Sequence, residues 1–229
     1  MKPYYVDEHV TLWHGDCREV TEWLAADVLV TDPPYGRGEA GIDASNRTTG
    51  RTYCGTNNHA PIVGDEDTEV RDSALTLWGG RPAVVFGDLR VATPSGIKQV
   101  AIYRKPPDAG MRSTAGFRRD VEAIYLMRLP VGYGGASSVI STNARLIGGT
   151  EGPAGRYGHP HAKPVDVMET LISHCPPGVV ADPFAGSGST LVAARNLGRH
   201  AIGVEIEERY CELIARRLSQ DVLPIGGAA

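Results

Sequence analysis

The sequence predicts an α/β fold built on a mostly parallel, doubly wound sheet. Short apolar runs alternate along the chain with helical patterns, which is typical of parallel strands joined by helical crossovers. Two of the runs end in unusual motifs, Asp32-Pro33-Pro34-Tyr35 and the string 181–190. Because α/β sheets bind ligands where strands end, both motifs are candidate sites. The length of 229 residues suits a single domain, 1–229.

Seven segments are predicted to be strands, because each is short and rich in apolar or β-branched residues. They are residues 10–14, 28–31, 83–86, 100–103, 121–127, 178–181 and 200–204. Helical patterns lie between them, from a brief crossover at 21–26 to a final helix of mixed charge. The helical segments are 21–26, 69–78, 164–174, 189–197 and 207–218.

Two long segments lack apolar periodicity. Residues 36–64 are rich in Gly, Asn, Thr, Ser and Arg, and they predict a mobile loop directly after Tyr35, with functionless disorder as the alternative. Residues 128–158 are glycine-rich and irregular, as expected of an insert that varies between relatives.

Basic residues concentrate in the middle of the chain. The net charge is −4, but residues 98–156 hold nine basic and four acidic residues, a local charge of +5. A polyanion lying across one face fits this pattern, while an unevenly charged solvated surface is the alternative. The candidate phosphate contacts are Arg104, Lys105, Arg118 and Arg119.

The sequence favours a cytoplasmic protein without a membrane segment. No apolar run approaches the roughly 18 residues that span a bilayer, and the first residues lack the apolar stretch of a signal peptide. The four cysteines form no CxxC pair, so we expect free thiols and no metal site.

The tetrapeptide Asp32-Pro33-Pro34-Tyr35 suggests a clamp for a flat amine. The two prolines lack backbone N–H groups, so the carbonyls around them are free acceptors beside the Asp32 carboxylate. An exocyclic NH2 on a planar base needs two acceptors for its hydrogens and an aromatic face, here Tyr35, for stacking. A strand-ending turn with an exposed tyrosine explains the same residues equally well.

The string 181–190 predicts a nucleotide site between a strand and a helix. Its glycines allow close approach to the backbone, while helix N–H groups and the Ser189 and Thr190 hydroxyls favour an anion. Glu205 follows 17 residues after Gly188, where an acid accepts ribose hydroxyls. Leu191 replaces the third glycine of the dinucleotide pattern, which argues against a pyrophosphate ligand, and no P-loop Lys follows.

Together the two motifs resemble the permuted, β-type amino-DNA methyltransferases, the N6-adenine and N4-cytosine family. In that family an Asp-Pro-Pro-Tyr motif precedes a Phe-x-Gly-x-Gly motif, as it does here. The resemblance covers nearly the whole chain. Further matches are residues 14–17, 86–88, 122–124 and 159–164. The resemblance implies a Rossmann-like fold with a seven-stranded sheet, S-adenosyl-L-methionine as cofactor, and the catalytic half before the cofactor half.

The resemblance also implies roles for individual residues. Asp16 would lie near the cofactor's adenine, Lys163 and Pro164 near its methionine end, and Glu205 on its ribose. The residues implied to surround the rest of the cofactor are Asp182, Phe184, Ala185, Gly186, Ser187, Gly188, Ser189 and Thr190. The implied catalytic residues are Asp32, Pro33, Pro34 and Tyr35.

The predicted reaction is methyl transfer to the N6 amine of an adenine flipped out of double-stranded DNA. Asp rather than Ser at position 32 favours adenine by family analogy, with N4-cytosine as the nearest alternative. More distant candidates are an RNA methyltransferase, a catalytically silent DNA-binding relative and a nicotinamide oxidoreductase. A homodimer and a cognate restriction endonuclease stay open as partners.

Overall fold

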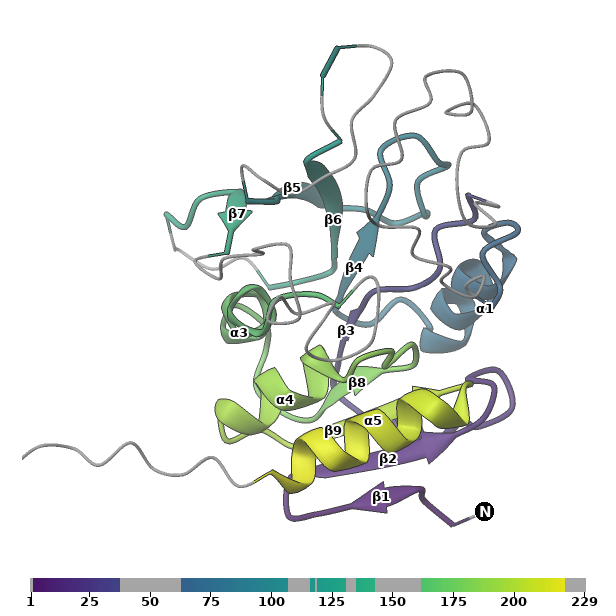
Figure 1. Cartoon of the computed structure of the whole chain (residues 1–229). Helices are drawn as coiled ribbons and strands as arrows, with labels where there is room; N and C mark the ends of the chain where they lie inside the picture. The colour runs from purple at the N-terminus through teal and green to yellow at the C-terminus, as the bar shows by residue number, and fades with distance from the viewer. Residues whose placement is uncertain are drawn as a thin grey trace, which may run out of the picture.

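A single mixed sheet organises the chain (Figure 1). The computed structural model describes residues 2–37, 63–106, 116–117, 119–130, 135–142 and 162–220. In these residues the strand order is β1-β2-β9-β8-β3-β4-β6-β5-β7. The strands are β1 (Tyr5–Val6), β2 (Val10–His14), β3 (Val28–Thr31), β4 (Ala83–Gly87), β5 (Gln99–Arg104), β6 (Val121–Met127), β7 (Val139–Ser141), β8 (Val180–Asp182) and β9 (Ala201–Glu205).

The predicted fold class is confirmed. All seven predicted strands are present, with ends shifted by at most two residues, and the pairs β2–β9, β9–β8, β8–β3, β3–β4 and β5–β7 are parallel. The pairs β1–β2, β4–β6 and β5–β6 are antiparallel. The described sheet exceeds the expected seven strands by the edge strands β1 and β7, which are two and three residues long and therefore too short for a sequence pattern.

The predicted helices are also present. They are η1 (Glu22–Ala25), α1 (Glu69–Trp78), α3 (Val165–Ser173), α4 (Ser189–Asn196) and α5 (Glu208–Ser219). Gly79 ends α1 in the left-handed region at φ 71°, which is the expected glycine C-cap. Pro164 immediately precedes α3, as expected for a helix that opens beside a proline.

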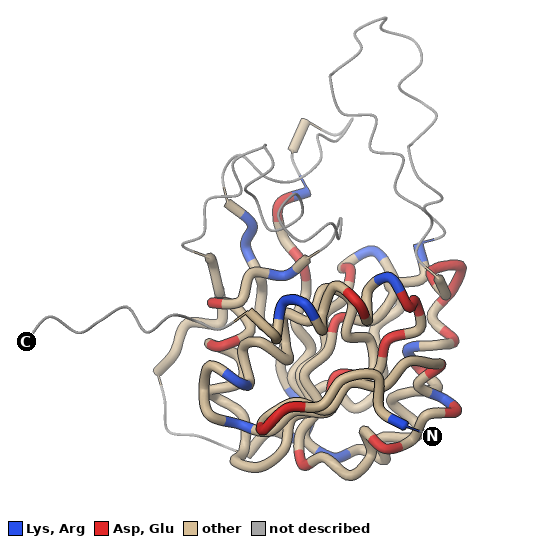
Figure 2. The backbone as a smooth tube through the Cα atoms, turned by 60° about the horizontal axis from the view of Figure 1, so that its bottom comes forward, with Lys and Arg blue, Asp and Glu red and all other residues tan. Residues whose placement is uncertain are grey.

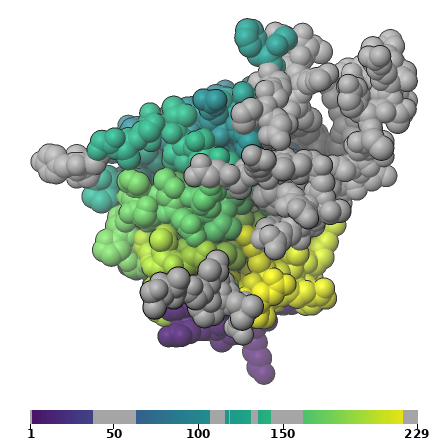
Figure 3. All heavy atoms as spheres, turned by 60° about the vertical axis from the view of Figure 1, so that its left-hand side comes forward, coloured from purple at the N-terminus to yellow at the C-terminus, as the bar shows by residue number. Residues whose placement is uncertain are grey.

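Helices cover both faces of the sheet, as a doubly wound fold requires. Alternate residues of β3 enter two cores, with Val28 and Val30 on one face and Leu29 on the other. The first core is closed by α3, α4 and α5, and Figure 1 shows α5 crossing β9 and β2. Figure 3 shows the green and yellow surface of these helices. The second core is closed by η1 and α1 through the stacked rings of Trp23 and Trp78.

The two irregular segments fall largely outside the described residues. Of the loop predicted at 36–64, residues 38–62 are not described, and of the insert at 128–158 the described parts are residues 128–130 and 135–142. The latter part contains β7, a strand that the sequence pattern missed. Within the described residues, no helix is long and apolar enough to cross a membrane.

Leu191 of α4 packs directly against Gly203 of β9. The small residue at this helix–strand contact is therefore on the strand, and not at position 191 of the helix. A Cβ on Gly203 of β9 would lie 2.7 Å from Leu191 Cδ1 and 3.4 Å from Ala185 Cβ. The close approach of helix and strand is therefore retained, with the small residue on the strand. Gly203 on β9 thus allows the close packing that the third glycine of the dinucleotide pattern would allow on the helix.

We expect Gly203→Val to lower the free energy of unfolding by about 1–3 kcal/mol, because overpacking displaces Leu191 and the loop that precedes α4. Urea titration measures the change. If Leu191 is the obstacle, the combination with Leu191→Ala costs less than the sum of the two single variants, whereas additive costs would place the strain elsewhere.

Candidate active site

The two sequence motifs meet at the carboxyl ends of neighbouring strands. Asp32 follows β3 and Asp182 ends β8, and these strands pair in parallel although they are far apart in sequence. Thr31 Oγ1 donates a hydrogen bond to Asp182 Oδ1 over 2.6 Å. This edge of the sheet is where α/β folds bind ligands, and the motifs form one continuous site there.

The Asp32 carboxylate has a donor on each oxygen. The Tyr35 hydroxyl donates to Oδ1 over 2.7 Å, and the Lys163 ammonium donates to Oδ2 over 2.5 Å. Asp65 accepts the backbone N–H groups of Tyr35 and Gly36 at 2.9 and 3.0 Å, which fixes the turn after Pro34. Tyr35 is therefore directed toward Asp32 rather than standing as an isolated exposed ring.

Lys163 joins the two halves of the site. Its ammonium lies 3.2 Å from Glu122 Oε2 and 5.0 Å from the Phe86 ring centroid, while its carbonyl accepts a hydrogen bond from Ser189 Oγ at 2.7 Å. Burial lowers the pKa of Lys163, but the carboxylates of Asp32 and Glu122 outweigh burial and raise it. The family resemblance implies that Lys163 lies near the methionine end of the cofactor, and the structure pairs its ammonium with the Asp32 and Glu122 carboxylates.

Glu122 is a site residue that the motifs did not single out. It lies at the start of β6, and its Oε1 is 2.6 Å from the Lys105 ammonium. Burial raises the pKa of Glu122, but the neighbouring Lys163 and Lys105 outweigh burial and hold it below its usual range. Residues 122–124 match the family in sequence, but that match gives Glu122 no role, and only the pairing of β6 with β4 and β5 reveals its place.

The glycine-rich loop wraps around Glu205. Gly186 and Gly188 adopt left-handed φ values of 52° and 78°, and a Cβ on Gly188 would lie 3.0 Å from Ile214. Glu205 accepts the N–H groups of Gly186 at 2.7 Å and Glu207 at 2.8 Å, one on each oxygen. Burial raises the pKa of Glu205 to about 7, against these hydrogen bonds, which lower it.

Asp182 is a buried carboxylate inside the same loop. Burial raises its pKa to about 6, although hydrogen bonds from the side chains of Thr190 and Thr31 lower it. The N–H of Phe184 also donates to Asp182 Oδ1, over 3.2 Å. Asp182 therefore shapes the turn between β8 and α4.

The loop hydroxyls bond within the protein. Ser187 Oγ and Ser189 Oγ lie 3.1 Å apart, Ser189 Oγ donates to Lys163, and Thr190 contacts Asp182. Arg217 of α5 is buried and donates to the Ser187 carbonyl over 2.8 Å. The hydroxyls expected to favour an anion are thus directed to neighbouring protein groups.

Asp16 lies beside Glu205 at the same edge. His14 pairs with Glu205 across β2 and β9, and the Gly15 N–H donates to the Glu205 carbonyl over 2.9 Å. The Asp16 carboxylate pairs with Arg18 at 2.5 Å. That hydrogen-bonded pair holds the pKa of Asp16 below its usual range.

The candidate DNA contacts divide into two groups. Lys105 pairs with Glu122 in the cluster around Asp32, while Arg104 is exposed at the end of β5 and Arg119 precedes β6. Arg118 lies outside the described residues. Figure 2 shows basic and acidic residues interspersed over the described backbone. The positive middle of the chain depends partly on residues beyond that portion: Arg112, Arg118, Arg145 and Arg156.

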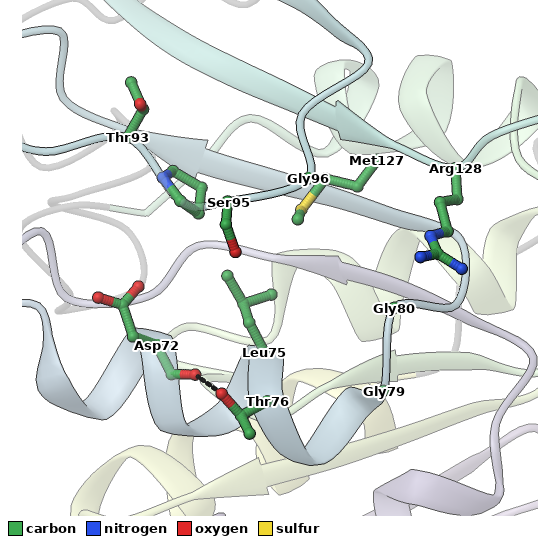
Figure 4. A pocket seen from close by; sticks show the side chains of 11 residues that line it. Asp72, Leu75, Thr76, Gly79, Gly80, Thr93, Ser95, Gly96, Met127 and Arg128 are labelled. Atoms are coloured by element: carbon green, nitrogen blue, oxygen red, sulfur yellow. Dashed lines mark hydrogen bonds between the residues drawn. The ribbon is translucent and has the colours of Figure 1, made fainter.

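A separate cavity of about 520 Å³ lies at the opposite edge of the sheet, between α1 and residues 93–96 (Figure 4). Met127 and Arg128 line it, and Met127 pairs with Ala83 at the start of β4. None of the candidate site residues lines this cavity. Across the described ranges, no group of three or more His, Cys, Asp or Glu side chains is placed to hold a metal ion.

Comparisons with known proteins point to one family. Residues 138–216 match a family model described as DNA methylase. The Type II methyltransferase M.ScaI of Streptomyces caespitosus is 27% identical over 96% of this chain and 84% of its own length. The putative methylase YubD of Escherichia coli (strain K12) is 46% identical over 68 residues, which are 29% of this chain and 30% of that protein.

Solved structures share the fold. The M1.HpyAVI–SAM complex superposes with a TM-score of 0.59 at 19% identity, covering 91% of this chain and 99% of that one. The PvuII DNA methyltransferase, which is described as cytosine-N4-specific, gives a TM-score of 0.66 at 14% identity, covering 97% and 90%.

Proposed function

We infer that the chain is a member of the N6/N4 DNA methylase family and a DNA methyltransferase that uses S-adenosyl-L-methionine. The observation that carries this inference is the 2.6 Å hydrogen bond from Thr31 to Asp182, because it ties the amine clamp to the cofactor loop. A clamp and a cofactor loop that share one edge can bring an amine and a methyl donor together.

The chemistry of the loop fits this cofactor. Each Glu205 oxygen accepts one backbone N–H and keeps further acceptor capacity, as two adjacent ribose hydroxyls require. Asp16 lies next to Glu205, where it would contact the adenine end of the cofactor. The turn between β8 and α4 contains Phe184, Ala185, Gly186 and Gly188, which would surround the rest of the cofactor. When bound, S-adenosyl-L-methionine supplies a methyl group on a sulfonium, which a nitrogen lone pair attacks directly.

The clamp residues orient and stabilise the amine. Asp32 and the Pro33 carbonyl accept its two hydrogens, which turns the nitrogen lone pair away from the ring plane, while Pro34 fixes the turn and Tyr35 contacts the base. Asp32 would also stabilise the positive charge that develops on the amine nitrogen when it takes the methyl group. Because the methyl group passes directly to the amine, no covalent enzyme intermediate is required. The amine would lose one proton, and the Asp32 carboxylate that accepts its hydrogen bond is placed to take it or pass it to water.

We propose the N6 amine of adenine in double-stranded DNA as the acceptor. The Asp at position 32 favours adenine by family analogy, whereas N4-cytosine presents the same amine geometry and is the activity named for the PvuII enzyme. A homodimer, a cognate restriction endonuclease and a cytoplasmic location are compatible with this proposal and are open to separate tests.

Expression in a host that lacks DNA methylation, followed by sequencing that reports modified bases, tests base and recognition site together. N6-methyladenine at one sequence supports the proposal, and N4-methylcytosine selects the alternative. Cofactor binding without methyl transfer to DNA would indicate a silent DNA-binding relative. Failure to bind S-adenosyl-L-methionine would favour the nicotinamide oxidoreductase.

We expect the double variant Arg118→Ala/Arg119→Ala to weaken binding to all DNA sequences alike, because phosphate contacts position DNA without reading bases. Loss of two phosphate contacts lowers the slope of log K against log salt by about 2. Titrations of specific and unrelated duplexes at several salt concentrations measure both effects. An unchanged slope would place the DNA backbone elsewhere.

A further inference from the structure

Two hydrogen-bond donors of the clamp lie between two carboxylates. The Lys163 ammonium is 2.5 Å from Asp32 Oδ2 and 3.2 Å from Glu122 Oε2. The Tyr35 hydroxyl is 2.7 Å from Asp32 Oδ1 and 3.5 Å from the same Glu122 Oε2. Each donor is closer to Asp32, yet each already has Glu122 as a second acceptor.

This arrangement matters because both Asp32 oxygens are engaged in the free protein. Each Asp32 oxygen keeps further acceptor capacity, but a target amine that donates to Asp32 shares the carboxylate with Lys163 and Tyr35 and so weakens their hydrogen bonds to it. Lys163 is only 8% exposed, so an ammonium displaced from Asp32 cannot simply move into water. A buried charge without a partner is strongly unfavourable, and it therefore needs another carboxylate nearby.

Glu122 is oriented for that role. Lys105 holds Oε1 at 2.6 Å, which leaves Oε2 directed toward Lys163 and Tyr35. The backbone of Glu122 is fixed in β6, where it pairs with Tyr103 of β5, and the Lys105 N–H donates to the Asp120 carbonyl over 2.7 Å. On the other side, Ser189 anchors the backbone of Lys163.

We propose that Glu122 is a positioning residue that receives the Lys163 ammonium and the Tyr35 hydroxyl when the target amine occupies Asp32. This inference rests on the proposed DNA methyltransferase function and adds a step to it. The exchange frees the Asp32 acceptors for the amine while the lysine stays paired. It moves hydrogen bonds only, so no proton or electron leaves the cluster.

A double-mutant cycle tests the exchange. Glu122→Gln keeps the shape of the side chain but removes the charge that receives Lys163, so we expect kcat/KM for DNA to fall about tenfold or more. The Kd for S-adenosyl-L-methionine should stay within about threefold of the wild-type value. In a Lys163→Met background no ammonium needs a second partner, and the same Glu122→Gln change should then cost less than about threefold.

A second readout separates positioning from folding. In duplexes with 2-aminopurine next to the target adenine, Glu122→Gln should reduce the fluorescence increase that reports extrusion of the target base, while thermal unfolding and cofactor binding confirm an intact fold. Glu212→Gln is the matched control, because Glu212 also pairs with a basic side chain, Arg216 at 2.7 Å, but lies on the exposed face of α5. If Glu122→Gln does not fold, Glu122→Asp replaces it, since the shorter carboxylate withdraws from Lys163 and should also lower kcat/KM.

Equal losses for Glu122→Gln in both backgrounds, or wild-type fluorescence and kcat/KM in the single variant, would overturn the exchange. In Glu122→Asp, wild-type kcat/KM would do the same. A wild-type protein that transfers no methyl group to any DNA would instead refute the proposed function, and this inference with it.

Discussion

Replacement of Asp32 by alanine is expected to abolish methyl transfer while leaving cofactor binding nearly unchanged. The carboxylate orients the amine and stabilises the positive charge that grows on nitrogen, and removal of one such preorganised group typically costs about 10²–10³-fold in rate. Because Asp32 serves both purposes, we expect a loss in kcat at the upper end of this range. Single-turnover transfer of a tritiated methyl group to DNA measures it.

Three further measurements test whether the loss of activity comes from catalysis rather than from misfolding or lost cofactor binding. The Asp32→Ala variant should bind S-adenosyl-L-methionine with a Kd within a few-fold of wild type, and it should keep a cooperative thermal transition, since Lys163 retains Glu122 as a partner. Asp72→Ala removes an exposed carboxylate on α1, beside the cavity at the opposite edge, and should leave transfer intact. Near-normal activity of Asp32→Ala would refute the catalytic assignment.

The second large effect is expected for Glu205→Gln, which should weaken S-adenosyl-L-methionine binding by about 10–100-fold. A hydrogen bond to a charged group contributes about 1.5–3 kcal/mol, and the neutral amide has only one acceptor oxygen for two hydroxyls. Isothermal titration calorimetry measures the change. The glycine-rich loop should stay folded, because the Gln oxygen can still accept the Gly186 N–H and only the Glu207 N–H loses its acceptor.

The pH dependence of cofactor binding gives an independent check on Glu205. Burial raises the pKa of Glu205 to about 7, and the ionised form is the better acceptor for hydroxyls. Affinity should therefore fall as the pH drops below about 7, by up to tenfold per unit, and level off above it. Glu205→Gln should remove this dependence. The same pH profile in both proteins would assign the titration to another group, with Asp182 the nearest candidate.

Packing explains which candidate residues the sequence could identify. Asp32-Pro33-Pro34-Tyr35 and the string 181–190 are contiguous, and each follows a buried strand, so local patterns revealed them. Glu122 and Lys105 belong to the same cluster only because β5 and β6 pair antiparallel, which brings the end of β5 beside the start of β6. Similarly, Leu191 of α4 packs against Gly203 of β9. Gly203 lies outside the motif that contains Leu191, so the motif could not reveal this contact.

By itself the sequence determined the seven main strands, the helices between them and the two motifs, because hydrophobic periodicity and turn chemistry are local properties. Only the tertiary structure decided that Lys163 pairs with Asp32 and Glu122, and that Lys105 pairs with Glu122. A buried ammonium must find carboxylates in space, and their positions depend on the order of strands in the sheet. That order is a property of the whole chain, so the charge cluster could not be read from any one segment.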